Sequence, residues 1–317
     1  METVFVTGGT GKIGRYLVGL LVSKGFKVKV LTRGKENLWS GISNLELIKG
    51  DILNMGLVEK SIKGCDYIFH LAVYQNANDK GIAISRQVNV SGTKVLFDSL
   101  FGMRVKKIVY VSTAMVFQDT GKIPRDENWP QKKNCIYDNY LQTKIEALAM
   151  VREMKKNLPI VIVYPTAVMD LKDFSSSAPA TKGNLQRFLW EKLGGGIPGG
   201  LVNLIGPKDR IFNYAAVEDV AEGIFLAALN GKEGEGYILG GENITVADYL
   251  ERASKKIGKK PSSIRIPLWV IKVFSKLGGG IFVSPIISSI AKYGLKDICF
   301  SSDKAIKNIG YNPKTKI

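Results

Sequence analysis

Histidine is almost absent from this sequence: His70 is the single one among 317 residues. Cysteine is nearly as scarce, and Cys65, Cys135 and Cys299 are scattered without the short spacings of zinc sites. We therefore expect no metal centre, and cysteines that pack as small apolar thiols in a reducing compartment.

Long apolar stretches are also missing, because no run reaches the roughly 18 uncharged apolar residues that mark a transmembrane helix. The chain begins directly with the β-branched run at residues 3–6, without the basic segment and cleavage site of a signal peptide. Both absences predict a cytoplasmic protein.

Acidic residues are scarce relative to basic ones, with 28 Asp and Glu against 45 Lys and Arg, which gives a net charge of +17. A nucleic acid or an anionic membrane would be one partner for such a surface. Because the lysines are spread along the whole chain, we favour a solvated lysine-rich surface and expect no nucleic-acid partner. Residues 267–277 (PLWVIKVFSKL) allow either peripheral contact with an anionic membrane or a helix that closes a substrate pocket, and we favour the pocket.

Short β-branched runs alternate with helical patterns in the first half of the chain. Strands are predicted at residues 4–7, 27–31, 45–49, 67–71, 107–112 and 160–164, and helices at 13–24, 55–62, 85–101 and 137–155. Such alternation is typical of βαβ units and predicts an α/β fold, a Rossmann-type doubly wound parallel sheet.

The pattern changes after residue 165, where serine, glycine and proline indicate loops at 173–182 and 194–200. A helix at 217–229 and a strand at 237–239 follow, and the chain from 246 onward is helical and mixed. We expect a dinucleotide-binding core at 1–165, to which 213–240 returns. Residues 166–212 and 241–317 are expected to form a smaller C-terminal substrate-binding lobe.

A glycine-rich loop follows the first predicted strand and opens the first helix. A tight turn and close approach to a pyrophosphate both need residues without a Cβ, and a helix N-terminus offers free N–H groups to phosphates. The residues that we expect to bind the cofactor here are Gly8, Thr10, Gly11, Lys12, Ile13 and Gly14.

The end of the second strand distinguishes the two nicotinamide cofactors. An acidic residue there would hold the ribose 2′-hydroxyl of NAD, but this chain has Arg33 and Lys35 instead. A guanidinium can pair with a 2′-phosphate, so we expect NADP, with NAD as the alternative. Asp51, after the third strand, would contact the adenine or cap the next helix.

Tyr140 and Lys144 lie four residues apart in a predicted helix and therefore on one face of it. A free tyrosine has a pKa of about 10, and a neighbouring ammonium lowers it, which makes the phenol a usable acid–base group. Tyr137 has no such partner, because Leu141 stands four residues later. Thr113 follows a buried strand, where its hydroxyl would either donate to a substrate oxygen or satisfy the strand end.

These residues resemble the extended short-chain dehydrogenases, also called the NAD-dependent epimerase/dehydratase family. Further matching segments are residues 50–52 (GDI), 70–72 (HLA), 89–93 (NVSGT), 111–117 (VSTAMVF), 164–168 (YPTAV) and 217–221 (VEDVA). Residues 237–243 (YILGGEN), 300–305 (FSSDKA) and 310–313 (GYNP) are similar to the dihydroflavonol-reductase-like branch, which includes hopanoid-associated sugar epimerases.

The resemblance implies catalytic roles for Thr113, Tyr140 and Lys144, and a place for Asn89 in ordering a proton-relay water. It makes His70 a structural residue rather than a general base. It adds cofactor contacts from Ile52, Leu71, Ala72, Tyr164, Pro165 and Val168. It also implies a homodimer formed through the helices at 85–101 and 137–155.

Departures from the family pattern reduce the number of activities that we expect. Dehydratases carry Asp-Glu after the catalytic threonine, where this chain has Ala114-Met115, so dehydration is not expected. Many sugar epimerases have arginine at the positions of Tyr164 and Phe212, although Arg210 is close to the latter. The predicted function is an NADP(H)-dependent carbonyl reductase or alcohol dehydrogenase acting on a small molecule. The alternatives are a nucleotide-sugar epimerase that retains its cofactor and a non-catalytic NADP-binding protein.

Overall fold

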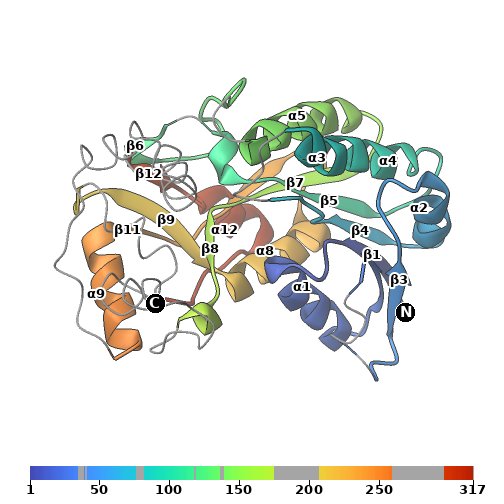
Figure 1. Ribbon diagram of the computed structural model, residues 1–317, viewed down its shortest axis with the longest axis horizontal. Coiled ribbons are helices and arrows are strands. Elements are labelled where there is room, and N and C mark those ends of the chain that lie inside the picture. Colours follow the sequence, from blue (N-terminus) through green and yellow to red (C-terminus); the bar gives the residue numbers. More distant parts are fainter. Residues whose placement is uncertain are drawn as a thin grey trace, which may run out of the picture.

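The protein consists of a large parallel sheet covered by helices on both faces and a second, smaller sheet beside it (Figure 1). The computed structural model describes residues 1–34, 39, 41–75, 82–117, 119–135, 139–174, 207–258 and 296–316. The segment at 267–277, the loop at 194–200 and most of the loop at 173–182 lie outside the described residues.

The large sheet has seven parallel strands in the order β10-β7-β5-β4-β1-β2-β3. Their bounds are Thr3–Thr7 (β1), Lys27–Thr32 (β2), Leu45–Lys49 (β3), Tyr67–His70 (β4), Lys107–Val111 (β5), Ile160–Pro165 (β7) and Gly236–Leu239 (β10). The strand order reverses direction between β1 and β4, which is where dinucleotides bind in such sheets. The predicted Rossmann-type fold is confirmed, and every strand predicted for the first half of the chain is present.

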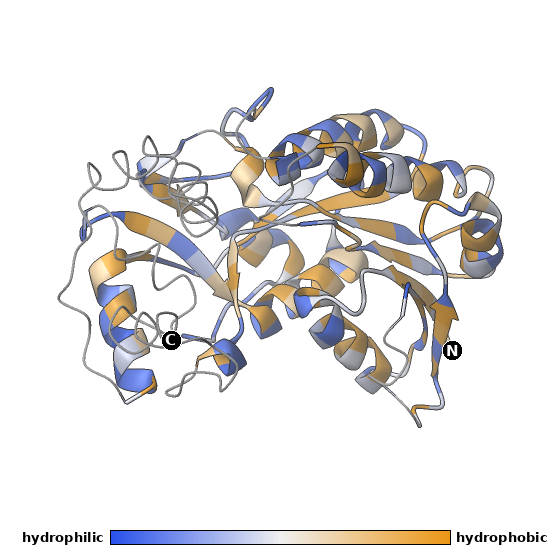
Figure 2. Cartoon of the chain, viewed as in Figure 1, coloured by the Kyte–Doolittle hydropathy of each residue, from blue (hydrophilic) through white to orange (hydrophobic). Residues whose placement is uncertain are grey.

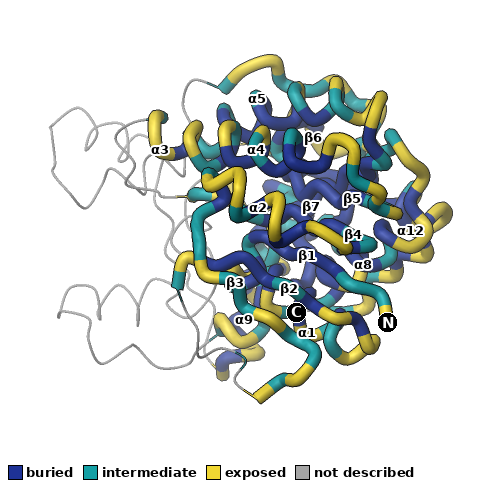
Figure 3. Tube along the Cα trace, turned by 90° about the vertical axis from the view of Figure 1, so that its right-hand side faces the viewer, coloured by how far each residue is buried: buried dark blue, intermediate teal, exposed yellow. Residues whose placement is uncertain are grey.

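Helices α1 (Lys12–Ser23) and α8 (Val217–Asn230) pack on one face of the sheet, and α2 (Met55–Ile62), α4 (Gly92–Asp98) and α5 (Asn139–Met154) on the other. Alternate strand residues enter two separate apolar clusters, as the pleat of a doubly wound sheet requires. Apolar residues dominate the strands between the helices (Figure 2), and Figure 3 shows the largely buried strands of the large sheet between helices whose outer sides are exposed.

The helix predicted at 85–101 is present in three parts. It begins as α3 (Ile82–Arg86), widens into a π-helical turn (η2, Gln87–Ser91) and continues as α4. Single π-turns of this kind are frequent at functional sites. The turn contains Asn89, whose side chain is buried, so the irregular backbone coincides with one of the predicted site residues.

The second sheet was not predicted from the sequence. It contains β11 (Glu242–Thr245), β9 (Ile211–Ala216), β12 (Ile298–Phe300) and β6 (Gly121–Arg125) in that order, and β8 (Ala167–Met169) pairs with β9. The Asn213 side chain donates to the Asn243 Oδ1 (3.0 Å) and to the Phe300 carbonyl (3.4 Å), which joins three of these strands. Helix α9 (Val246–Lys256) packs on this sheet, and α12 (Asp303–Ile309) packs on α8.

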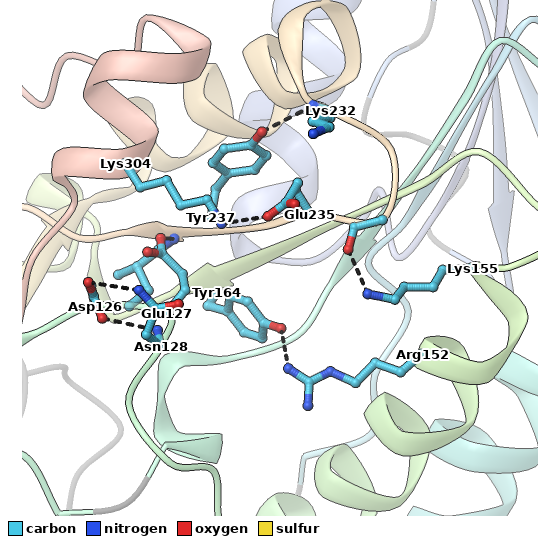
Figure 4. Close-up of polar contacts among 12 residues, drawn as sticks. Asp126, Glu127, Asn128, Arg152, Lys155, Tyr164, Lys232, Glu235, Tyr237 and Lys304 are labelled. Carbon is cyan, nitrogen blue, oxygen red and sulfur yellow. Dashed lines mark hydrogen bonds and ion pairs between the residues drawn. The ribbon is translucent and has the colours of Figure 1, made fainter.

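Strand β10 forms one edge of the large sheet, and a carboxylate covers part of that edge. The Glu127 Oε1 accepts a hydrogen bond of 2.6 Å from the Ile238 main-chain N–H. Figure 4 shows Glu127 beside Tyr164 and near the Lys304–Glu235 ion pair, which measures 2.8 Å. Burial raises the pKa of Glu127, and the hydrogen bond from Ile238 opposes that shift. In the described part of the chain, no helix is long and apolar enough to span a membrane.

Two glycines of α1 test how closely this helix approaches the glycine loop that follows β1. A Cβ at Gly14 would lie 2.2 Å from the Gly8 carbonyl oxygen and 2.7 Å from the Gly9 Cα, whereas a Cβ at the exposed Gly19 would meet nothing within 4 Å. We expect Gly14→Ala to lower the free energy of unfolding by about 1–3 kcal/mol through overpacking. Gly19→Ala, the matched control, should raise it by about 0.5–1 kcal/mol. Urea unfolding measures both, and equal stability of the two variants would contradict the close approach.

Candidate active site

The glycine loop between β1 and α1 is shaped for a bound phosphate group. Gly8 has a φ of 72°, and a Cβ there would lie 2.5 Å from both the Leu71 carbonyl carbon and the Ala72 nitrogen. The Gly11 N–H donates to the Gly8 carbonyl (3.0 Å), which closes the turn. No side chain caps α1 at Gly11, so its first N–H groups point at an open loop. These residues fit a dinucleotide pyrophosphate.

A cleft of about 190 Å³ opens beside this loop. Predicted cofactor residues line it at the ends of four strands, β1, β2, β3 and β4. The lining also includes residues that were not predicted: Thr7, Leu31, Thr32, Gly50, Val73 and Val88. The predicted residues in the lining are Gly8, Thr10, Gly11, Arg33, Asp51, Ile52, Leu71 and Ala72. The cleft therefore brings together groups that the sequence separates by more than sixty positions.

Arg33 is exposed at the rim of this cleft, at the end of β2. Lys35 lies outside the described residues. The Asp51 Oδ1 accepts from the Leu53 N–H (2.9 Å), whereas Asn54 caps α2 by accepting from the Leu57 N–H (3.0 Å). The capping alternative for Asp51 is therefore wrong, because Asn54 has that role.

The Lys12 side chain does not line the cleft and forms an ion pair with Asp173, in the short helical turn Leu171–Asp173. Beside it, the Tyr16 hydroxyl donates to the Asp170 Oδ1 (3.0 Å). Burial and this hydrogen bond raise the pKa of Tyr16 to about 12. Two contacts thus join α1 to the segment that follows β8.

Lys144 is buried on α5, with 5% of its surface exposed. Its Nζ donates to the Val111 carbonyl (2.8 Å) and lies 5.3 Å from the ring centroid of Tyr110. Burial lowers the pKa of Lys144 to about 8. Among the described residues no carboxylate pairs with this ammonium group. It is therefore held at the end of β5, one helical turn from Tyr140.

Hydroxyl groups gather at the ends of β5 and β7. Thr113 is 7% exposed, and its Oγ1 accepts from the Met115 N–H (3.3 Å), which leaves the hydroxyl hydrogen free to donate elsewhere. The buried hydroxyls of Ser112 and Thr166 have no hydrogen-bond partner among the described residues. Neither was among the predicted site residues, although Ser112 ends the strand predicted at 107–112 and Thr166 lies two residues after the strand predicted at 160–164.

Both polar atoms of the Asn89 side chain form hydrogen bonds inside the protein. Its Nδ2 donates to the Thr143 Oγ1 (2.9 Å) and to the Tyr74 carbonyl (3.0 Å), and its Oδ1 accepts from the Tyr74 N–H (2.6 Å). Its main-chain carbonyl accepts from the Thr93 hydroxyl (2.7 Å). The side chain therefore ties the π-turn to α5 on one side and to the segment after β4 on the other.

His70 is 2% exposed and has a hydroxyl at each ring nitrogen. Its Nδ1 lies 2.6 Å from the Thr7 Oγ1, and its Nε2 lies 2.8 Å from the Thr93 Oγ1. Burial, with a smaller effect of the Lys144 charge, lowers the pKa of His70 to about 3. The ring is neutral at physiological pH, which agrees with its interpretation as a structural residue.

The Tyr164 side chain is buried in the apolar cluster that includes residues of α5. Its hydroxyl accepts from the Arg152 guanidinium (3.3 Å) on the side of the sheet that α5 covers (Figure 4). Pro165 ends β7, and Val168 is half-buried in β8. No cluster of candidate metal ligands occurs among the residues that the structure describes.

A family model matches most of the chain. The model of the NAD-dependent epimerase/dehydratase family matches residues 4–240, well over half of the chain.

Curated relatives match almost the whole chain at low identity. A Synechocystis sp. protein whose name provisionally assigns dihydroflavonol 4-reductase activity is 28% identical, over 98% of this chain and 90% of its own length. A Stigmatella aurantiaca protein named 4-hydroxy-2-methyl-3-oxo-4-farnesyl-3,4-dihydroquinoline-1-oxide ketoreductase is 26% identical, over 97% and 91%. A Dictyostelium discoideum decarboxylating sterol-4-alpha-carboxylate 3-dehydrogenase is 23% identical, over 99% and 97%.

Solved structures share the fold. The dTDP-glucose 4,6-dehydratase of Streptomyces venezuelae, solved with NAD, has a TM-score of 0.74 at 20% identity and covers 100% of this chain and 93% of its own. The UDP-glucose 4-epimerase of Thermotoga maritima has a TM-score of 0.72 at 18% identity and covers 99% and 94%.

Proposed function

The chain belongs to the NAD-dependent epimerase/dehydratase family and is an NAD(P)-dependent enzyme of the extended short-chain dehydrogenase type, and we propose that it is an NADP(H)-dependent carbonyl reductase. The observation that carries the proposal is the buried Lys144 ammonium, held at the Val111 carbonyl at the end of β5, two residues before Thr113 in the chain and one helical turn from Tyr140. A cytoplasmic location, in keeping with three free cysteines, belongs to the same proposal.

Each of the three side chains has a role in reduction. NADPH, when bound, supplies the hydride that reduces the carbonyl carbon. Tyr140 donates its phenolic proton to the carbonyl oxygen, and the positive charge of Lys144 favours the phenolate that is left. The Thr113 hydroxyl donates a hydrogen bond to the same oxygen and stabilises the charge that develops there. Ser112 and Thr166 offer two further buried hydroxyls at this edge.

The absence of an acidic pair after Thr113 supports reduction rather than dehydration, because Ala114 and Met115 have no acid–base group. A sugar epimerase is the second candidate, and it is favoured by Arg210, a buried cation directly before β9 in the smaller lobe. Dialysis separates the two, because an epimerase retains its cofactor while a reductase exchanges it. A substrate screen by NADPH absorbance should include prenylated and sterol-like ketones, since two relatives are named for such substrates.

The first test of this mechanism removes the transferable proton. Tyr140→Phe should abolish turnover and leave NADPH affinity nearly unchanged, because the ring keeps its packing. Lys144→Met should damage both turnover and cofactor affinity. Thr113→Val should cost about 10²–10³ in rate, and Thr113→Ser should be mild. Single-turnover hydride transfer in folded variants is the measurement, and a Tyr140→Phe protein that reacts near the parent rate would refute the mechanism.

The second test concerns cofactor choice. Arg33→Asp should weaken NADPH binding by tens of fold, since a lost charge-assisted pair costs about 2 kcal/mol, and should leave NADH binding nearly unchanged. Arg104→Asp is the matched control, because Arg104 is exposed and lies outside the cleft. Fluorescence titration measures both affinities. Equal affinity of the parent protein for NADH and NADPH would show that Arg33 does not select the cofactor.

The third test concerns the homodimer, which we propose to form through α3, α4 and α5. Ile84 on α3 is 51% exposed, and α3 packs against α5, where the Arg86 guanidinium pairs with Glu146 through two hydrogen bonds of 2.8 Å. Ile84→Glu should convert the dimer to a monomer. Ile123→Glu, on β6 and 62% exposed, is the control. Light scattering at micromolar concentration gives the mass, and a monomeric parent would disprove the dimer.

A further inference from the structure

A continuous row of hydrogen bonds joins the glycine loop to the catalytic helix. The Ala72 N–H donates to the Thr7 Oγ1 (3.2 Å), which lies 2.6 Å from the His70 Nδ1. The His70 Nε2 lies 2.8 Å from the Thr93 Oγ1, which donates to the Asn89 carbonyl (2.7 Å).

The row continues from Asn89 into α5. The Asn89 Nδ2 donates to the Thr143 Oγ1 (2.9 Å), and the Thr143 hydroxyl donates to the main-chain carbonyl of Tyr140 (2.9 Å). The row therefore begins beside Gly8, at a residue that lines the nucleotide cleft, and ends on the residue that we propose as the proton donor.

For a neutral His70 ring, the direction of every hydrogen bond in this row is fixed by counting hydrogens. A threonine hydroxyl has one hydrogen, and that of Thr93 is given to the Asn89 carbonyl. The Thr93 oxygen must then accept from the His70 Nε2–H. The unprotonated Nδ1 is left to accept the hydroxyl hydrogen of Thr7, whose oxygen accepts from Ala72. Of the two neutral tautomers of the ring, only the Nε2–H form satisfies the row.

The surroundings of His70 oppose any charge on the ring. Thr7, His70, Asn89, Thr93 and Thr143 are at most 3% exposed. The charged or titratable groups that face the ring are the Lys144 ammonium on α5 and the Tyr110 phenol on β5, whose ring centroid lies 5.7 Å away. Phe97 of α4 adds an apolar edge contact at 6.3 Å. No carboxylate among the described residues bonds to the ring, so an imidazolium there would face a like charge without compensation.

We propose that His70 is a positioning residue whose fixed tautomer, through Thr93, Asn89 and Thr143, sets the place of Tyr140 relative to the nucleotide loop. The role in turnover rests on the proposed carbonyl reduction, whereas the tautomer and the hydrogen-bond order do not. His70 touches neither reacting atom, and it acts by holding the π-turn between β4 and α5.

The first experiment uses the single histidine of the chain as a spectroscopic probe, because ¹⁵N-histidine labelling gives signals from His70 alone. We expect one ring nitrogen protonated, the Nε2, with no titration between pH 8 and about pH 4.5. Thr93→Val removes the acceptor of the Nε2–H and should shift both ring signals. Thr120→Val, a buried threonine bonded to the Cys299 N–H in the other sheet, is the matched control and should leave them unchanged.

The pH dependence of the free energy of unfolding also reports whether the His70 ring is neutral, because protonation and unfolding are linked. The folded pKa is below the unfolded value, so the neutral ring contributes stability above about pH 6.5 that is lost as the pH falls toward the folded pKa of about 3. As the pH falls from 6 to 4.5, the unfolding equilibrium constant of the parent should rise about tenfold per pH unit relative to that of His70→Gln, which lacks the titrating group.

The kinetic experiment separates positioning from simple stability. Thr93→Val and Thr143→Val should slow single-turnover hydride transfer about tenfold or more and displace its pH profile, because Tyr140 is no longer held against Lys144. Thr93→Ser keeps the hydroxyl and loses a methyl group, so it should be destabilised yet react near the parent rate. Thr120→Val, the control outside the row, should likewise be destabilised and react near the parent rate.

Three results would overturn the proposal: a His70 that titrates near pH 6.5, an Nδ1–H tautomer, or Thr93→Val reacting as fast as Thr93→Ser. If His70→Gln fails to fold, the rates of the threonine variants and the His70 spectrum of the parent still decide whether the proposal holds. If the parent reduces no carbonyl in the screen, the proposed function fails, and the tautomer measurement alone decides whether the hydrogen-bond row exists.

Discussion

A buried positive charge that has no carboxylate partner among the described residues constrains the centre of this protein. The Lys144 ammonium is compensated by the Val111 carbonyl and the face of Tyr110 rather than by an ion pair. A paired carboxylate would have raised its pKa and neutralised its field. Without such a partner, the charge can act on the phenol of Tyr140. The surrounding groups must tolerate the charge: His70 is neutral, and the nearby side chains are hydroxyls, amides and aromatic rings. The chemistry of the site and the polarity of its surroundings follow from this one group.

The first half of the fold could be predicted because its signals are local. Residues 107–111 form a mostly β-branched run that is buried on both faces, and such runs are typical of parallel strands. The second sheet gives no comparable signal. Its strands are three to six residues long and come from positions as distant as Gly121 and Phe300, so their pairing depends on tertiary contacts. Gly121–Arg125 even contains a proline and is mostly exposed, which is possible at the edge of a sheet and argues against a strand in sequence reasoning.

The candidate site was predictable to a similar extent. Gly8, Thr10, Arg33 and Asp51 could be placed around one cleft, because strand ends of a parallel sheet converge. Lys12 resembled a phosphate contact by position, yet its side chain pairs with Asp173 from a distant segment. The roles of Thr7, Thr93 and Thr143 were invisible, because a threonine in a strand or helix has no signature of its own. They depend on a shared histidine and on a π-turn that a regular helical pattern cannot reveal.

The hydrogen bond between Glu127 and strand β10 has a consequence for how the molecule behaves in a crowded solution. An outer strand with open N–H groups is a template on which another chain can add a strand, which is how sheets aggregate. Here the Ile238 N–H is already occupied by a carboxylate that belongs to the same chain and cannot extend the ladder. A carboxylate also repels the carbonyl groups that an incoming strand would present. The same contact that completes the local packing thus acts as a barrier to self-association along this edge, and it would weaken in acid as Glu127 takes up a proton.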